Sequence, residues 1–456
     1  MDTPAAEETT HYRELAGEFT SEYCEKLDAL VSRASVRRDQ EAVLECARVL
    51  AEIMRDSGVD ASIMPTEGPP LVLGRYFPEP ANPDRPTLLV YGHYDVEDAD
   101  ASRWNYPPFA LTRSRGRLYG RGTADDKGGI LCHLMALKIL RSATDEPSSN
   151  LVFLFEGGGE SGSRGLAEFV AGHQNLLAAN ASYTADGPRR GDRPNLYLGV
   201  RGLLSLELRI AGTRREVHAG DFSGELMNPA LEMARLLTAL VGDTGECLVP
   251  GFHRDVREPR PGDLHLVENL RHGPEVAAEG LSRPDAYRRL LFRPSCNVSM
   301  LSAGDTECEG RSIVPGEARA RLDFRLVPDQ DPVRILGLID SYLKKWEPDA
   351  EFHVLASMPP SRTDPEAPVV GRMVRILQAI SGAAPDVYPL MTGAAPDFLF
   401  TRVLGIPSLW VPYADRDRAS HAADENLRVK AAISGMVTSA TVFRHLLSSN
   451  SPNREG

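Results

Sequence analysis

The stretch Thr87-Leu-Leu-Val-Tyr-Gly-His-Tyr-Asp-Val96 joins a short apolar run to a glycine, a histidine and an aspartate. Its first five residues have the length and composition of a buried β-strand. His93 and Asp95 follow two residues apart at the end of this strand, so both side chains can point the same way. Asp95 could therefore orient a metal-binding imidazole at His93. A histidine satisfied within a loop is the alternative.

Buried strands alternate with helices on both sides of this stretch. Residues 12–56 have a helical apolar period, 129–141 and 164–179 are predicted helices, and 150–155 is a second buried strand. This alternation predicts an α/β fold with a mostly parallel sheet flanked by helices. Ligands of such sheets gather at the carboxyl ends of the strands, where the polar clusters of this sequence lie.

The pattern changes in the middle of the chain. Residues 203–210 and 318–326 alternate apolar and polar side chains, which is typical of a sheet with one wet face. We therefore predict an inserted α+β domain within a discontinuous metal-binding domain, followed by a disordered tail. The predicted limits are residues 12–198 plus 363–447 for the metal-binding domain, 199–362 for the insertion and 448–456 for the tail.

Composition excludes several classes of function. The 456 residues carry a formal net charge of −13, which disfavours nucleic acid and anionic membranes as partners. The first residues lack the basic start and apolar core of a signal peptide, and no apolar run approaches the ~20 residues of a membrane span. Six scattered cysteines are typical of reduced thiols. These features predict a cytoplasmic location.

Two glycine-rich segments carry the other carboxylates. Leu118-Tyr-Gly-Arg-Gly-Thr-Ala-Asp-Asp-Lys-Gly-Gly129 is unlike a phosphate loop, because its lysine follows acidic residues and the Walker spacing is absent. Phe155-Glu-Gly-Gly-Gly-Glu-Ser-Gly-Ser163 repeats the pattern, and Asp186 and His421 follow further predicted strands. Two histidines and several carboxylates at strand ends suit a hydrolytic pair of divalent ions, although spacing alone does not assign their roles.

In these motifs the chain resembles the metallopeptidases that include carnosinase, cytosolic non-specific dipeptidase, aminoacylase and acetylornithine deacetylase. The resemblance extends from about residue 12 to 445 and is strongest to the carnosinase-like dipeptidases. The matching stretches are 92–96, 118–129, 160–163, 199–202, 248–251, 293–295, 313–316 and 324–328.

The resemblance implies two divalent ions per chain, with Zn²⁺ as the first choice and Mn²⁺ or Co²⁺ as alternatives. It assigns His93 and Asp186 to one ion, Glu160 and His421 to the other, and Asp125 to a bridge between them. It also implies that Asp95 orients His93.

The resemblance makes the insertion, residues 199–362, a lid that also forms a homodimer. His218 matches a lid histidine that reaches the partner subunit's site and stabilises the developing oxyanion there. A histidine in a surface loop is the alternative. Asn297 and Arg325 match lid positions near the substrate.

Two departures from the family concern catalysis. Relatives usually carry a glutamate at the position of Gly159, where it acts as general base. Glu156, at the predicted strand end, is the candidate substitute base if the glycine turn bends it inward. Relatives also often hold a substrate carboxylate with an arginine and a serine or threonine in the segment that here, at 390–396, is small and apolar.

We therefore expect metal-dependent hydrolysis of an amide bond in a small substrate such as a dipeptide or an N-acyl amino acid. Two alternatives stay open. A repurposed relative could use the metal pair for acyl transfer, cyclisation or elimination in a small-molecule biosynthetic pathway, and the missing base favours this reading. A catalytically silent binding homologue is the other, and the five intact ligands disfavour it.

Overall fold

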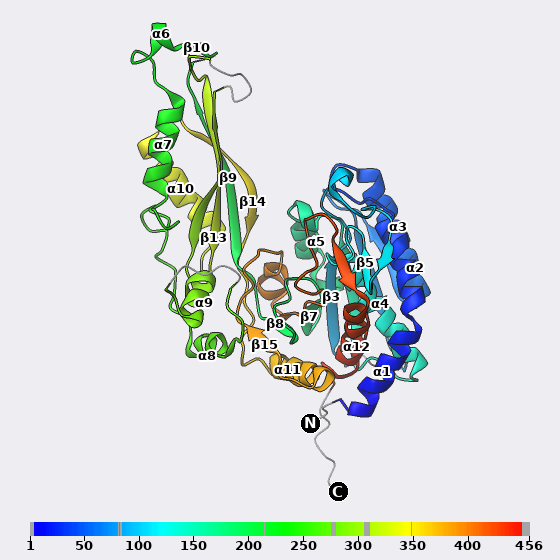
Figure 1. Ribbon diagram of the computed structural model, residues 1–456. Coiled ribbons are helices and arrows are strands. Elements are labelled where there is room, and N and C mark those ends of the chain that lie inside the picture. Colours follow the sequence, from blue (N-terminus) through cyan, green and yellow to red (C-terminus); the bar gives the residue numbers. More distant parts are fainter. Residues whose placement is uncertain are drawn as a thin grey trace.

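The computed structural model describes residues 4–80, 82, 84–213, 215–274, 280–304, 311–347 and 349–448. It shows a body built on a large sheet and a second, antiparallel sheet that extends away from the body (Figure 1). The predicted fold class, a mostly parallel sheet between helices with a separate α+β part, is confirmed. Residues 449–456 of the predicted tail lie outside the described residues.

The large sheet has eight strands in the order β1-β2-β6-β3-β7-β16-β8-β15. Its four central strands, β6, β3, β7 and β16, are parallel, whereas β1, β2 and β8 join the sheet by antiparallel pairs. The strands are β1 (Asp60–Met64), β2 (Leu71–Tyr76), β3 (Thr87–His93), β6 (Asn150–Glu156), β7 (Ala181–Thr184), β8 (Asn195–Tyr197), β15 (Asp386–Tyr388) and β16 (Ser408–Trp410).

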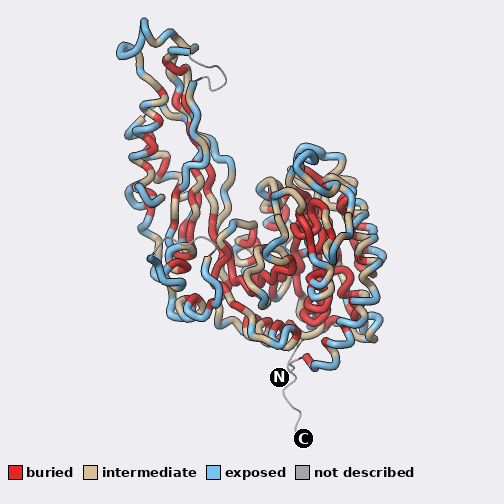
Figure 2. The backbone as a smooth tube through the Cα atoms, in the orientation of Figure 1, coloured by how far each residue is buried: buried red, intermediate tan, exposed pale blue. Residues whose placement is uncertain are grey.

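Helices cover both faces of this sheet because its central strands are apolar on both sides. The backbone in the interior of the body is accordingly coloured as buried in Figure 2. One face packs against α1 (Ala6–Glu18), α2 (Thr20–Val31), α3 (Gln40–Asp56), α4 (Lys127–Ser142), α11 (Pro368–Ser381) and α12 (Val429–His445). The other face packs against α5 (Leu166–Gly172), α8 (Pro261–Asn269), α9 (Arg283–Phe292) and a π-helical turn (Leu399–Val403).

Gly92 allows α4 to approach β3 closely. A Cβ atom at this position would lie 2.6 Å from an Asp126 carboxylate oxygen and 2.8 Å from Ile130. The absence of a side chain therefore brings the start of α4, and the aspartates before it, next to the end of β3.

The second sheet, with two helices on one face, is called the extension below. Its strands lie in the order β11-β13-β9-β14, with β9 at Gly202–Ala211, β11 at Ser295–Ala303, β13 at Glu317–Leu326 and β14 at Glu351–Met358. Helices α7 (Pro229–Leu240) and α10 (Pro332–Trp346) bury its apolar face. The opposite face carries ion pairs such as Arg321 with Glu207. The sheet therefore has one wet face.

Short elements complete the described structure. β10 (Val217–His218), β12 (Ile313–Val314) and α6 (Ala219–Phe222) form the outer end of the extension. A three-stranded sheet consists of β4 (Thr112–Ser114), β5 (Arg117–Tyr119) and β17 (Asn426–Arg428). Within the described ranges, no helix has the length and apolar character needed to cross a membrane.

Candidate metal centre

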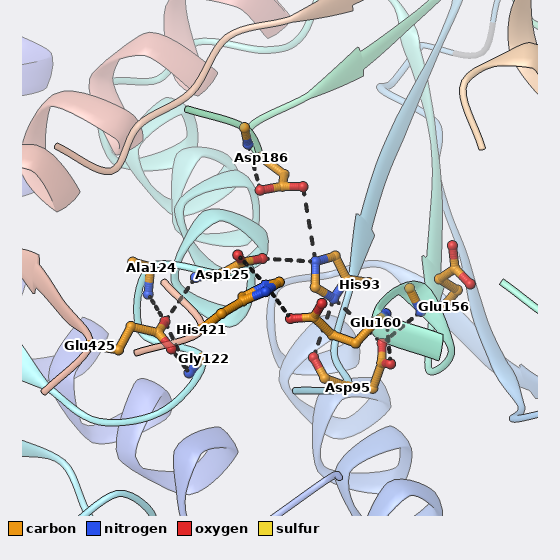
Figure 3. Close-up of polar contacts among 12 residues, drawn as sticks. His93, Asp95, Gly122, Ala124, Asp125, Glu156, Glu160, Asp186, His421 and Glu425 are labelled. Atoms are coloured by element: carbon orange, nitrogen blue, oxygen red, sulfur yellow. Dashed lines mark hydrogen bonds and ion pairs between the residues drawn. The ribbon is translucent and has the colours of Figure 1, made fainter. Parts of the chain in front are cut away.

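Two groups of metal-ligating side chains meet at the carboxyl ends of the central strands. Figure 3 labels the five predicted ligands among them. We call His93, Asp125 and Asp186 the first half, and Glu97, Glu160 and His421 the second half. Within each half the donor atoms lie within 4.8 Å of one another. The structure thus brings together all five predicted ligands and adds Glu97, which sequence reasoning did not single out.

The strands explain why these residues converge. His93 is the last residue of β3, and Asp186 lies just past β7. Glu160 lies in a 3₁₀ turn, Gly159–Ser161, directly after β6, and His421 lies in the loop after β16. Since β6, β3, β7 and β16 are parallel neighbours, their carboxyl ends share one edge of the sheet.

Asp125 lies between the two halves. Its Oδ1 is 3.1 Å from His93 Nε2, and its Oδ2 is 3.4 Å from His421 Nε2. His93 Nε2 is also 4.0 Å from Asp186 Oδ2, and His421 Nε2 is 3.2 Å from Glu160 Oε1. One carboxylate therefore faces both imidazoles, as a bridging ligand requires, and the bridging role itself stays a prediction.

Asp95 holds two parts of the centre in place. Its carboxylate accepts the backbone N–H groups of Gly159 and Glu160 at 2.9 and 3.0 Å. The same carboxylate lies 3.4 Å from His93 Nδ1. This position would allow Asp95 to orient the His93 ring, a role that stays a prediction, and the two accepted hydrogen bonds hold the turn that carries Glu160.

A second buried carboxylate holds the Asp125 loop. Glu425 accepts the backbone N–H groups of Gly122, Ala124 and Asp125 at 2.9–3.1 Å and pairs with Arg121 at 2.8 Å. Sequence reasoning missed this residue. A glutamate four residues after His421 was the only local signal, and its partners lie about 300 positions away.

Gly159 lies directly against the imidazole of the first half. A Cβ atom there would lie 2.7 Å from both Cβ and Cγ of His93. The His93 side chain therefore occupies the space that a side chain at this position would need, and a larger residue requires the turn or the His93 ring to move.

Glu156, the candidate substitute base, lies at the buried end of β6. Its Oε1 accepts hydrogen bonds from the hydroxyls of Tyr91 and Ser163, the latter at 2.9 Å. Burial raises its pKa to about 7. Its carboxylate points away from the donor side chains in Figure 3. The glycine turn thus does not bend it toward the centre in this conformation.

The charge distribution of the centre suits cations. Hydrogen bonds to Asp125 and Glu160 raise the pKa of His421 to about 10. Burial, together with the neighbouring Asp125 carboxylate, raises the pKa of Asp186 to about 6. Crowded carboxylates thus favour positive charge, which divalent ions could supply. Imidazole nitrogens with carboxylate oxygens form a donor set that fits Zn²⁺, Mn²⁺ or Co²⁺.

The predicted lid residues lie on the extension. His218 is exposed at its outer end, beside β12 and α6, far from the sheet edge that carries the centre (Figure 1). Asn297 is exposed in β11, and Arg325 lies near the end of β13. Among the described residues, no hydrogen bond or ion pair joins these three to the five predicted ligands.

One further charged group borders the first half. The Arg418 guanidinium donates to the carbonyl oxygen of Gly187, next to Asp186, and its positive charge acts to lower the pKa of Asp125 and of Asp186. Arg418 precedes His421 by three residues in the same loop. Sequence reasoning missed it because an arginine in a charged loop usually belongs to a solvated surface.

Comparisons with known proteins agree with this geometry. The profile of Peptidase family M20/M25/M40 matches residues 89–449. The Cys-Gly metallodipeptidase DUG1 of Candida albicans is 27% identical over 458 residues, covering 92% of this chain and 94% of that protein. The human Beta-Ala-His dipeptidase is 28% identical over 272 residues, covering 57% and 53% of the two chains.

Solved structures share the whole fold. The M20 family metallo-carboxypeptidase Sso-CP2 of Sulfolobus solfataricus superposes with a TM-score of 0.87 at 29% identity, covering 93% of this chain and 99% of that one. The dipeptidase Dug1p of Saccharomyces cerevisiae gives a TM-score of 0.85 at 22% identity, covering 98% and 100%. The chain therefore belongs to Peptidase family M20/M25/M40 and is a metal-dependent, peptidase-like enzyme.

Proposed function

We propose that this enzyme hydrolyses the amide bond of a dipeptide or an N-acyl amino acid with two divalent ions, Zn²⁺ as the first choice and Mn²⁺ or Co²⁺ as alternatives. The observation that carries the proposal is the position of Asp125, which directs one carboxylate oxygen toward the imidazole of each half. The dipeptidase names of relatives over most of the chain support the substrate class.

In the proposed reaction each residue has a distinct task. His93 and Asp186 would hold one ion, Glu160 and His421 the other, and Asp125 would bridge them. When bound, such ions act as Lewis acids toward the amide carbonyl and lower the pKa of water. Asp95 would hold the His93 ring and the turn that carries Glu160 in position.

The general base distinguishes this chain from the family pattern that it resembles. Gly159 has no side chain to accept a proton, and positioned acid–base groups contribute roughly 10²–10⁴ in rate. Glu156 is the proposed substitute base on sequence grounds. Its hydrogen bonds with the hydroxyl groups of Tyr91 and Ser163 must break before its carboxylate can face the metal centre. We therefore expect slow hydrolysis of ordinary dipeptides.

A repurposed, non-hydrolytic role is the second candidate. Gly159 favours it, and so does the 390–396 segment, where Leu390 and Met391 are buried apolar residues. Such an enzyme would perform acyl transfer, cyclisation or elimination in a biosynthetic pathway. A catalytically silent binding protein is the third candidate, and the intact set of donors disfavours it.

We further propose a homodimer formed through the extension, in which His218 serves the partner subunit's site and Asn297 and Arg325 contact the substrate. The apolar side chains of Val298 and Leu301, exposed in strand β11 at one edge of the sheet, support this proposal. We also propose a cytoplasmic location, which the five unpaired cysteines among the described residues support.

A substrate panel tests the proposed function. Metal-free protein is reloaded with Zn²⁺, Mn²⁺ or Co²⁺ and incubated with Cys-Gly, β-Ala-His and N-acetyl amino acids, and the products are identified by mass spectrometry. Hydrolysis should require metal and should vanish in Asp125→Ala. A cyclised or transferred product would favour the second candidate, and substrate binding without any product would favour the third.

A further inference from the structure

The second half contains a carboxylate in addition to the predicted ligands. Donor atoms of Glu97, Glu160 and His421 all lie within 4.8 Å of one another. Protein ligands lie about 2.0–2.2 Å from Zn²⁺, so two donors on one ion are at most roughly 4.4 Å apart. The three side chains can therefore converge on one ion with shifts of a few tenths of an ångström.

We propose that Glu97 is itself a metal ligand, together with Glu160, His421 and the bridging Asp125, of the ion in the second half. The inference uses the two-ion centre of the proposed function. It requires metal binding there but no particular reaction, so it can be tested without a substrate.

Three other carboxylates around the centre are engaged elsewhere. Glu156 accepts from two hydroxyl groups behind the turn, and Glu425 accepts backbone N–H groups and pairs with Arg121. Asp95 holds the turn and the His93 ring. Glu97 lies only two residues past Asp95, on the segment that follows β3. This one segment therefore carries both Asp95, which lies beside His93 of the first half, and a donor side chain of the second half.

The extra donor makes the two halves chemically different. The first half offers three protein ligands, His93, Asp125 and Asp186, and leaves one position of a tetrahedron open. With Glu97 the second half offers four, which is the closed arrangement of structural zinc sites. The inference therefore places the exchangeable position, where a substrate or water can bind, on the side of His93 and Asp186.

Charge balance gives an independent reason for Glu97. Two divalent ions carry four positive charges, and Asp125, Asp186, Glu160 and Glu97 carry four negative charges when ionised. Counting only the ions and their donor side chains, the set without Glu97 would retain one net positive charge. A glutamate at position 159, as the family pattern has it, would supply the same fourth charge, and its absence here agrees with Glu97 taking over that electrostatic task.

The test compares two adjacent acidic residues. Glu97→Gln removes the donor charge while keeping the size of the side chain. Asp98→Asn is the matched control, because Asp98 is exposed and pairs with Arg38 at 3.1 Å on the surface. Metal-free proteins are titrated with Zn²⁺ against a chelator of known affinity, and bound zinc is counted by mass spectrometry. The melting temperatures of the metal-free proteins show whether each variant folds like wild type.

We expect wild type and Asp98→Asn to bind two ions, and Glu97→Gln to bind the second ion at least about tenfold more weakly. Glu97→Asp, which keeps the charge on a shorter side chain, should fall between them and provides the test if Glu97→Gln folds poorly. Wild-type affinity in both Glu97 variants would overturn the assignment. So would a loss of hydrolysis without any change in zinc affinity, because it would assign Glu97 to proton transfer or substrate contact.

Failure of the proposed function gives a different result. If wild type hydrolyses none of the amide substrates but Glu97→Gln still loses affinity for one ion, the ligand assignment stands and the hydrolytic proposal fails. If hydrolysis is observed and the zinc affinities of wild type and both variants are equal, only the ligand assignment fails.

Discussion

Glu425 Oε1 accepts a hydrogen bond from the backbone N–H of Asp125 at 3.1 Å. The contact joins the loop that carries His421 to the loop that carries the predicted bridging ligand. Glu425 and its ion-pair partner Arg121 are both almost fully buried, with side chains 0% and 3% exposed. The placement of Asp125 therefore depends on an internal charge pair.

Glu425→Gln should destabilise the protein by about 3–5 kcal/mol, because it leaves the Arg121 guanidinium buried without a counter-charge. Urea unfolding of the metal-free protein measures this loss. Asp417→Asn, in the same loop, removes a half-exposed partner of Arg117 and Arg428, and because these ion pairs are open to solvent it should cost only about 1 kcal/mol. Equal stabilities of the two variants would contradict the structural role of Glu425.

Removing different ligands should have different effects on metal content. Asp125→Ala should bind neither ion tightly, because its carboxylate faces both halves. Asp186→Ala should lose only the ion of the first half. Zinc counted after dialysis distinguishes the two, and tight retention of one ion by Asp125→Ala would argue against the bridge.

The turn at Gly159 leads to a steric prediction. Gly159→Ala introduces a Cβ atom 2.7 Å from His93, which should cost about 1–3 kcal/mol in stability or displace the imidazole and weaken zinc binding in the first half. Gly158→Ala is the control, since its Cβ atom would make ordinary contact with Pro69 at 3.5 Å. Zinc affinity and unfolding free energy are measured for both. Because a glutamate at this position would make the same close contact with His93, Gly159→Glu should fail to restore the general base of the family.

Acid should destabilise the protein through His133. Burial lowers the pKa of this histidine from 6.5 to about 3, and its ring neighbours are Ser439, Tyr183 and Tyr413. Between these pH values the unfolded chain binds a proton that the native state excludes, so stability falls as pH decreases below about 6.5. The contribution is roughly 3 kcal/mol by pH 4.

His133→Gln removes this titrating group. The free energy of unfolding, measured by urea denaturation between pH 7 and pH 4, should fall less steeply in the variant than in wild type. The same change at the exposed His11 serves as a control and should leave the wild-type slope intact. Identical slopes for His133→Gln and wild type would mean that other groups cause the acid sensitivity.

A mixed dimer tests the proposed task of His218. His218→Ala should keep its metal, because the residue is exposed at the outer end of the extension, far from its own centre. It should lose activity, because the proposed role of His218 is in the partner subunit's site. Mixing it with Asp125→Ala, which loses metal, should restore partial activity in hybrid dimers. Absence of recovery after demonstrated subunit exchange would exclude action across the dimer.

The central strands and the convergence of the donors could be predicted because the signals are local. The apolar run before His93 became β3, and residues 150–155 became β6 with one residue added. The predicted helix at 164–179 was too long, since α5 ends at Gly172, a residue with poor helix propensity. A short 3₁₀ turn follows it.

The supporting residues could not be predicted from the sequence. Glu425 acts on backbone groups about 300 positions earlier, and Glu97 faces side chains on two other loops. No spacing rule connects such pairs, because only the packed sheet brings them together. Strand β1, at the edge of the sheet, and its neighbour β2 were missed as well, since the strands near the rim of this sheet have weaker apolar signals than the central ones.

The order of the donors along the chain has a consequence for biosynthesis. A ribosome that has completed His93, Asp125, Glu160 and Asp186 still has to translate the whole extension before it reaches His421 and Glu425. Until then the nascent chain holds half a centre. The negative charges of its carboxylates are not balanced by His421 or by two bound ions, and Glu425 is not yet present to hold the Asp125 loop. Completion of the two-ion centre should thus be a late, post-translational event, and a prematurely terminated polypeptide would be distinguishable in the cell by its failure to retain the second ion.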